Sequence, residues 1–187
     1  MKHLALYCAA GAALFAAGVL LGPSLNSASS AETPRQSAID RGKHLVTLSL
    51  CTDCHTPGYL RGAPDMERFL GGSETGFEIP GLGVFHGPNL TPDQATGLGK
   101  WTEEQIVTAF TTGVRPDGRT LAPIMPFHAF ASFPREDAFA IAAYLKSLPP
   151  VVNDVPGPFG PSETPTGFVM RVVAPAIEAE PRQIAGP

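Results

Sequence analysis

Basic residues and cysteines are both scarce in this 187-residue chain, and each shortage excludes a class of protein. Thirteen lysines and arginines stand against 17 aspartates and glutamates, which gives a formal net charge of −4. Because nucleic-acid-binding domains carry an excess of positive charge, this balance argues against a nucleic-acid partner. A structural zinc site needs four ligands, usually with a second Cys or His pair at short spacing, and the three cysteines and five histidines supply no such second pair.

The residue patterns of common enzyme sites are also missing. The sequence contains no pair of carboxylates and no Ser–His arrangement that would support acid–base or nucleophilic catalysis. The glycines at Gly71-Gly72 and Gly81–Gly83 are not followed by Lys-Ser/Thr and a helix, so they do not indicate a phosphate-binding loop. No alternation of apolar and polar residues extends far enough to predict a β-strand.

Glycine and proline are abundant instead, with 20 of each, which is typical of a globular protein with much loop and little regular structure. The segment between Thr56 and Lys100 is such a loop, and its length predicts that it wraps a bound group. We expect the folded domain to cover residues 32–150. A Pro-rich C-terminal extension, residues 151–187, is predicted to be either an arm lying on the domain or a docking segment.

The N-terminal segment has the organisation of a secretory signal peptide. Lys2 supplies a positive start, an uncharged and mostly apolar run extends from Leu4 to Leu21, and Ser29-Ser-Ala31 offers small residues for cleavage. We therefore expect residues 1–31 to be a signal peptide and the protein to reach the periplasm. The apolar run is also near the lower length limit of a membrane span, so a retained N-terminal anchor, with membrane association, is the alternative.

One short motif carries the main chemical signal. The pentad Cys51-Thr-Asp-Cys-His55 places two thiols three residues apart beside an imidazole. In an exported protein such a pair can be a disulfide, and beside a βαβ unit it can be a redox dithiol. The flanking residues show no βαβ pattern, whereas C-x-x-C-H is the attachment signature of c-type haem. We predict one haem c, bonded covalently through Cys51 and Cys54, with His55 as an iron ligand and a haem-free dithiol as the alternative.

The opposite side of such an iron needs a second ligand, and methionine sulfur is the cytochrome c arrangement. Met125 lies seventy residues past His55 in Leu121–Pro126, where two prolines make a stiff strap able to aim the side chain. Met66 is too close to His55 along the chain to reach the opposite face. We therefore predict Met125 as the distal ligand. The alternatives are Met170, His86, His128 and an open site.

Helical signals account for the three remaining segments. Residues 37–50 have apolar residues at helical spacing, with Ser37 as the expected N-cap. Thr102 and Gln105 form a capping box for a helix that ends at Gly113, and residues 132–148 form a helix that stops at two prolines. We predict an all-α fold, in which Gly42 of the first helix and Tyr144 of the last allow a close helix crossing.

Two more residues are candidates for binding the haem propionates. Trp101 has an N–H that can donate to a carboxylate, and packing in the core is the equal alternative. Arg115 can pair with a propionate, but the turn Pro116–Gly118 that follows it predicts a solvated side chain as the alternative.

The stretches "CTDCHTP", "NLTPDQATGLGKWTEEQI", "GVRPDGRTLAPIMPF" and "DAFAIAAYLKSLPPV" together resemble class I c-type cytochromes. More narrowly, they resemble the haem domains of cytochrome c subunits of bacterial periplasmic alcohol and aldehyde dehydrogenases, over about Ile39 to Pro158. The resemblance implies a small cytochrome c-type fold of three to four helices around one covalent haem, with long loops. It implies thioether bonds at Cys51 and Cys54, His55 as the proximal ligand and Met125 as the distal one. Those subunits usually carry two or three haem motifs, whereas this chain has one.

Single-electron transfer between a periplasmic dehydrogenase and the respiratory chain is the function that the resemblance implies. The partners would be that dehydrogenase, other cytochromes or a terminal oxidase. An iron with six ligands has no place for a substrate, so the chain is expected to be an electron carrier and not an enzyme. The alternative is a five-coordinate haem that senses a gas or acts as a peroxidase.

Overall fold

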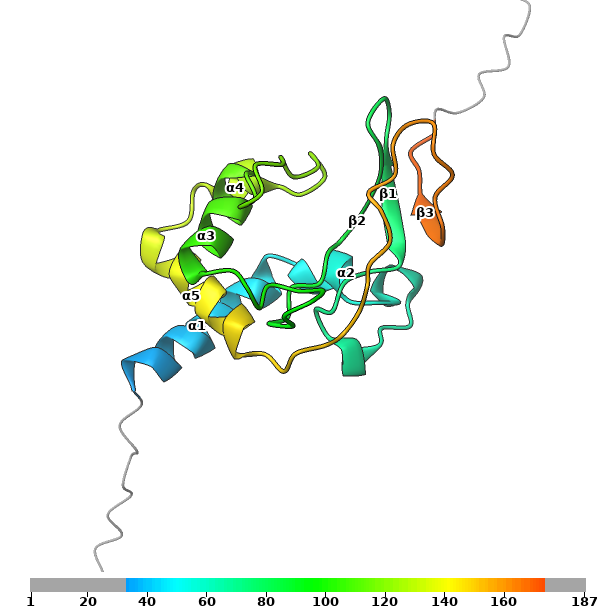
Figure 1. Ribbon diagram of the computed structural model, residues 1–187. Coiled ribbons are helices and arrows are strands. Elements are labelled where there is room, and N and C mark those ends of the chain that lie inside the picture. The colour runs from blue at the N-terminus through cyan, green and yellow to red at the C-terminus, as the bar shows by residue number, and fades with distance from the viewer. Residues whose placement is uncertain (1–32, 174–187) are drawn as a thin grey trace, which may run out of the picture. The chain divides into compact units, whose positions relative to one another are not determined.

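The computed structural model describes residues 33–173, and Figure 1 shows how their helices and strands are arranged. The α-helices of this range are α1 (Pro34–Leu48), α2 (Cys51–His55), α3 (Glu103–Thr112), α4 (Phe127–Phe130) and α5 (Arg135–Ser147). It also contains two 3-10 turns, η1 (Tyr59–Arg61) and η2 (Met66–Arg68), and the strands β1 (Thr75–Ile79), β2 (Gly83–His86) and β3 (Phe168–Met170). The predicted signal peptide, residues 1–31, lies outside the described residues.

Helices α1 and α5 cross at Gly42, where their backbones touch. A Cβ at Gly42 would lie 1.9 Å from the carbonyl oxygen of Ala140 and 2.8 Å from Cβ of Tyr144, so a side chain does not fit there. The predicted contact between Gly42 and Tyr144 is therefore confirmed. The start of α1 differs from the prediction, because Thr33 and not Ser37 is the N-cap and Pro34 occupies the first turn.

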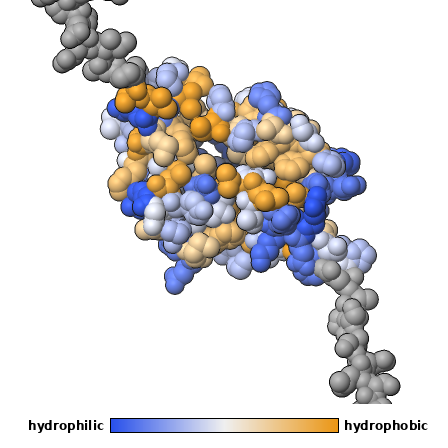
Figure 2. Space-filling model, turned by 180° about the vertical axis from the view of Figure 1, so that it is seen from behind, coloured by the Kyte–Doolittle hydropathy of each residue, from blue (hydrophilic) through white to orange (hydrophobic). Residues whose placement is uncertain are grey.

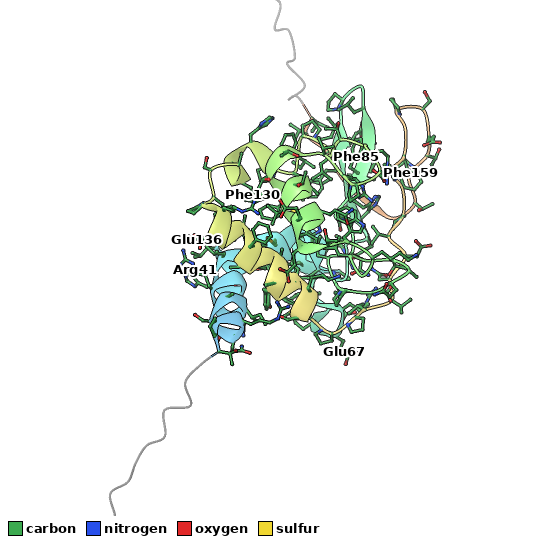
Figure 3. The ribbon with its side chains drawn as sticks, turned by 60° about the vertical axis from the view of Figure 1, so that its left-hand side comes forward. Arg41, Glu67, Phe85, Phe130, Glu136 and Phe159 are labelled. Carbon is green, nitrogen blue, oxygen red and sulfur yellow. The ribbon has the colours of Figure 1, made fainter. Side chains whose placement is uncertain are left out.

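A second contact fastens α1 to the first turn of α5. The guanidinium of Arg41 donates two hydrogen bonds to the Asp137 carboxylate, at 2.9 and 2.8 Å, and Figure 3 shows Arg41 beside Glu136 of α5. The core then continues from these two helices onto α3, through the buried apolar residues Leu45, Val46, Leu70, Leu98, Ile106, Val107, Ala138, Ile141, Ala142, Tyr144 and Leu145.

Helix α3 has the ends that its sequence predicts. The Thr102 hydroxyl accepts from the Gln105 N–H at 3.2 Å, and the Gln105 side chain accepts from the Thr102 N–H at 3.0 Å. Gly113 ends the helix with φ at +78°, a left-handed conformation that glycine adopts without steric cost. None of the helices in residues 33–173 is long and apolar enough to cross a membrane.

The all-α prediction is wrong, because a three-stranded sheet of order β2-β1-β3 stands beside the helices. Strands β1 and β2 form an antiparallel hairpin, and β3 pairs with β1 in parallel. The burial along β1 does not alternate, and β1 and β2 have only five and four residues. The sequence of these strands therefore lacks the alternation of apolar and polar residues that would predict a strand, although their hydrogen-bonded pairing is regular.

The described part of the C-terminal extension lies on this sheet and on the loop before it. Phe159 exchanges two backbone hydrogen bonds with Val84 of β2, at 2.9 and 3.0 Å, and Figure 3 shows it close to Phe85. Further along, the Phe168 ring lies under the Arg61 guanidinium at 4.3 Å. Of the two predicted arrangements, residues 151–173 therefore adopt that of an arm packed on its own domain.

Candidate functional site

The pentad Cys51–His55 forms a separate helical turn, α2, directly after α1. Leu50 joins the two helices with φ at +55°, a left-handed conformation that is strained for a residue with a branched side chain. Asp53 N–H then bonds the Leu50 carbonyl at 3.1 Å, and Thr56 N–H bonds the Thr52 carbonyl at 3.0 Å. The helical turn presents both thiols and the imidazole from one short segment, as the spacing predicts.

The Cys51 and Cys54 sulfurs are not bonded to each other, and both side chains are half-buried. Burial raises the pKa of the Cys51 thiol to about 11. The pKa of Cys54 is also raised, by burial first and by the Asp53 carboxylate second. Both groups are therefore neutral thiols near pH 7, which is the opposite of the low-pKa thiolate that a dithiol redox site uses.

The His55 ring is 5% exposed and has one defined hydrogen-bond partner. Its Nδ1 lies 2.8 Å from the carbonyl oxygen of Pro88, which only accepts, so Nδ1 carries the proton and Nε2 keeps its lone pair. Burial lowers the pKa of His55, with the Pro88 bond opposing that effect. A neutral imidazole whose Nε2 lone pair has no partner in residues 33–173 is suited to binding a metal ion.

Gly87, the residue directly after β2, lets the backbone there lie close against α2. A Cβ on Gly87 would lie 1.8 Å from the Cys54 carbonyl oxygen and 3.3 Å from Nδ1 of His55. Any larger residue would push the chain away from the imidazole and lengthen the bond to Pro88. The neighbouring backbone is also tied down, because Gly72 N–H donates to the His55 carbonyl at 2.8 Å.

Met125 lies in a tight turn just before α4. Its N–H donates to the Ala122 carbonyl at 2.9 Å, its carbonyl accepts from Phe127 N–H at 2.8 Å, and its side chain is half-buried. In Figure 1, α4 lies at the upper left and α2 near the centre of the domain, so the two helices are apart in this view. Met125 and His55 are thus presented by different elements.

The structure brings Trp101 and Arg115 together, although they lie 14 positions apart in the chain. The Arg115 guanidinium carbon lies 5.2 Å from the centre of the Trp101 ring, a cation–π contact. Arg115 Nε is buried without a hydrogen bond, although it lies 3.5 Å from Asp117 Oδ2 in an ion pair. Burial lowers the pKa of this side chain. By contrast, Arg119 in the same turn is 57% exposed and pairs with Asp117 at 2.9 Å.

Lys146 of α5 anchors the segment that carries Trp101. Its ammonium group donates to the carbonyl oxygens of Leu98, Gly99 and Trp101 at 3.2, 2.9 and 2.9 Å. This charged group uses all three of its donors on one loop and holds it against the last helix. The Trp101 position is therefore set by the core and not by the surface turn.

The alternative ligands lie on other elements than α2 and the Met125 turn. His128 is exposed on α4 and packs against Phe127, with ring centres 4.2 Å apart. His86 lies on β2 with its ring edge against Phe159, and both its ring nitrogens are buried without a partner. Met66 and Met170 are 58% and 44% exposed, on η2 and on β3. None of these side chains shares an element with the Leu121–Pro126 turn or with α2.

These residues fit a covalently held haem. Two free thiols and an imidazole with an open Nε2 stand on one helical turn. Gly87 lets the segment that carries Pro88 pack against that turn, and the buried Arg115 Nε makes no hydrogen bond, which a carboxylate could supply. Sequence reasoning missed Pro88 and Gly87. The Gly-Pro pair itself was the only local signal, because its contact with His55 spans 33 residues.

Hydrophobic side chains also reach the surface of this domain. Figure 2 shows them (orange) interspersed with hydrophilic residues (blue) on one face. Between residues 33 and 93, the exposed large hydrophobic residues are Leu48, Leu50, Tyr59, Met66 and Leu82. Leu48, the last residue of α1, is 64% exposed.

Several known proteins similar to this chain are cytochrome c subunits of dehydrogenases. The chain is 35% identical over 118 residues to the cytochrome c subunit of an alcohol dehydrogenase (quinone) of Gluconobacter oxydans, and this alignment covers 63% of the chain and 23% of the relative. It is 30% identical over 173 residues to the fructose dehydrogenase cytochrome subunit of Gluconobacter japonicus, covering 87% of the chain and 33% of the relative. A gluconate 2-dehydrogenase cytochrome c subunit of Pantoea cypripedii is 28% identical over 167 residues, 86% of the chain and 36% of the relative. The chain thus spans about a quarter to a third of these relatives' length.

The family model for cytochrome c matches residues 39–149, well over half of the chain. This range contains the helical turn with its two thiols and imidazole, the Trp101–Arg115 pair and the Met125 turn. Covalently bound haem c is the cofactor that such a domain implies. The chain belongs to the cytochrome c family.

Proposed function

We propose that this chain is a single-haem electron carrier that works in the periplasm, between a dehydrogenase and the respiratory chain. Cys51 and Cys54 would hold the haem through thioether bonds, and His55 and Met125 would bind its iron. When bound, the haem supplies a one-electron couple between ferric and ferrous iron. The observation that carries the proposal is the His55 ring, which is buried, neutral and fixed by Pro88 with Nε2 left open.

The chain's own residues do the remaining work in this proposal. Met125 provides a soft thioether, which favours ferrous iron and raises the reduction potential. Trp101 and Arg115 provide donors for the propionates, and pairing there gives the buried Arg115 Nε the acceptor that it lacks. If His55 and Met125 both bind the iron, the protein would supply both of the ligands proposed here and no position would remain for a substrate, which fits an electron carrier.

Dehydrogenase partnership is supported by the relatives, whose names describe cytochrome subunits of alcohol, fructose and gluconate dehydrogenases. Export is supported by the signal-peptide pattern of residues 1–31. A single haem is supported by the one C-x-x-C-H motif in the 187 residues. Co-purification from native membrane and soluble fractions tests the partner: a bound dehydrogenase subunit supports an enzyme-associated role, and a haem protein that transfers no electrons to or from any dehydrogenase refutes it.

The ligand assignment is tested by Met125→Ala with Met66→Ala as the matched control. Met66 is 58% exposed on η2, so its loss removes a thioether without affecting the Met125 turn. We expect Met125→Ala to change the oxidised and reduced absorption spectra and to lower the reduction potential, and Met66→Ala to change neither. Unchanged spectra in Met125→Ala would show that another group, or none, occupies the distal position.

A further inference from the structure

Asn89 is a buried polar residue to which the site described so far assigns no role. It follows Pro88, whose carbonyl oxygen accepts the His55 hydrogen bond. Its side chain is only 2% exposed. Because an amide in a protein interior is costly unless it is hydrogen-bonded, the partners of Asn89 show what it is for.

Every hydrogen-bonding position of the Asn89 side chain is used. Its Oδ1 accepts from the Thr91 N–H at 2.9 Å and from the Thr91 hydroxyl at 2.7 Å. Its Nδ2 donates to Thr96 Oγ1 at 3.0 Å and to the Val151 carbonyl at 2.7 Å. Two donors and two acceptor sites are the full capacity of an amide, so the Asn89 side chain is held in one orientation.

The same network reaches the C-terminal extension. The Val151 N–H donates to Thr91 Oγ1 at 3.0 Å, and the Asn153 N–H donates to Thr96 Oγ1 at 3.1 Å. The chain that leaves α5 is thereby joined to the loop around Asn89, sixty residues earlier in the sequence. Residues 151–153 therefore belong to the hydrogen-bond network that holds Asn89, the residue after Pro88.

Backbone contacts fix the chain on both sides of Pro88 and Asn89. Gly87 accepts from Ser73 N–H at 2.9 Å, and Leu90 N–H donates to the Leu70 carbonyl at 2.9 Å. Pro88 itself has no N–H, so its position depends on these neighbours and on the Asn89 side chain. Its carbonyl is held at 2.8 Å from the His55 imidazole by this arrangement.

We propose that Asn89 is a positioning residue for His55, holding the Pro88 carbonyl at hydrogen-bonding distance and coupling that bond to residues 151–153. The proposal rests on the proposed role of His55 as an iron ligand. A firm hydrogen bond from Nδ1 makes Nε2 a stronger donor to iron, since acceptors behind a ligating histidine raise its basicity. A stronger donor favours ferric iron, so this network lowers the reduction potential of the protein.

Two variants of the haem-loaded protein test this role. Asn89→Ala removes all four side-chain bonds, whereas Thr91→Val removes only the hydroxyl between Asn89 and Val151 and keeps the side-chain shape. We expect the reduction potential to rise in both variants, and to rise more in Asn89→Ala. We also expect faster solvent exchange of the His55 Nδ1 proton, measured by NMR in the reduced state. Thr91→Val carries the test if Asn89→Ala does not fold.

Arg41→Gln is the matched control, because it removes the α1–α5 ion pair and leaves the loop around Asn89 intact. It should lower the unfolding midpoint and leave both the potential and the Nδ1 exchange rate unchanged. If Thr91→Val and Asn89→Ala behave like Arg41→Gln, Asn89 supports only the fold and the proposal is refuted. Failure of the ligand assignment is seen separately, because His55→Ala would then leave the absorption spectra of the haem-loaded protein unchanged.

Discussion

Replacing Gly42 by alanine should destabilise the protein by far more than a surface substitution on the same helix. The added Cβ would meet the Ala140 carbonyl oxygen at 1.9 Å, where ordinary contact begins at 3.4 Å. That oxygen belongs to the backbone of α5 and cannot rotate away, so the two helices must separate. Their separation would open the core around Val46 and Ala142, which are 1% and 0% exposed.

Two opposing effects determine the size of this change. Overpacking a well-packed core costs about 1–3 kcal/mol, and a backbone clash belongs at the upper end of that range or above it. Alanine is favoured over glycine inside a helix by about 1 kcal/mol, which offsets part of the cost. We therefore expect Gly42→Ala to lower the free energy of unfolding by about 2 kcal/mol or more, and the melting temperature by roughly 4–8 °C.

Urea unfolding of the purified haem-loaded protein, followed by circular dichroism, measures the effect. Lys43→Ala is the matched control, because Lys43 is the next residue of α1 and its side chain is exposed. Its free energy of unfolding should stay within about 0.5 kcal/mol of the wild-type value. A Gly42→Ala protein as stable as the wild type would show that α1 and α5 do not cross at this distance.

Three further substitutions test other parts of the structure. Thr102→Ala removes the cap of α3 and should lower the free energy of unfolding by about 1 kcal/mol in denaturant titrations. The hydrogen-bonded Arg41 lowers the pKa of Asp137 below its usual 3.8. The wild type should therefore be more stable than Asp137→Asn by its full margin above about pH 5, and by less below about pH 4. A margin that does not change with pH would contradict the Arg41–Asp137 ion pair. Arg115→Gln should lower the reduction potential in spectroelectrochemical titration, because a positive charge near the iron disfavours the ferric state. The same substitution at the exposed Arg119 should leave the potential unchanged. Equal effects of the two substitutions would show that Arg115 does not lie beside the haem.

Local signals made the helices and the haem motif predictable from the sequence. The capping box of Thr102 and Gln105 and the end at Gly113 depend on residues within one helix, and C-x-x-C-H needs only one turn. The contact of Gly42 with Tyr144 could also be predicted, because both lie on the apolar faces of strongly signalled helices. For these features, the local sequence signals and the packing of the folded chain favour the same structure.

Contacts between distant segments explain what the sequence did not reveal. Strand β3 comes from the C-terminal extension and pairs with Thr75–Phe77 of β1, and no pattern within three residues indicates such a partner. The turn after Arg115 suggested a solvated side chain. The contact with the Trp101 ring instead accompanies its burial, and this contact is between distant segments. The acceptor for His55 was unknown for the same reason, because Pro88 approaches from a different loop.

Covalent attachment of one haem to Cys51 and Cys54 is the central claim, and intact-mass measurement of the denatured protein tests it most directly. The protein is produced in a host that attaches c-type haem, and the thiols are alkylated before measurement. The account predicts a mass increased by one haem, with neither Cys51 nor Cys54 alkylated, and loss of the stable adduct in the double variant Cys51→Ser, Cys54→Ser. A polypeptide without added haem, with both thiols alkylated, would contradict it.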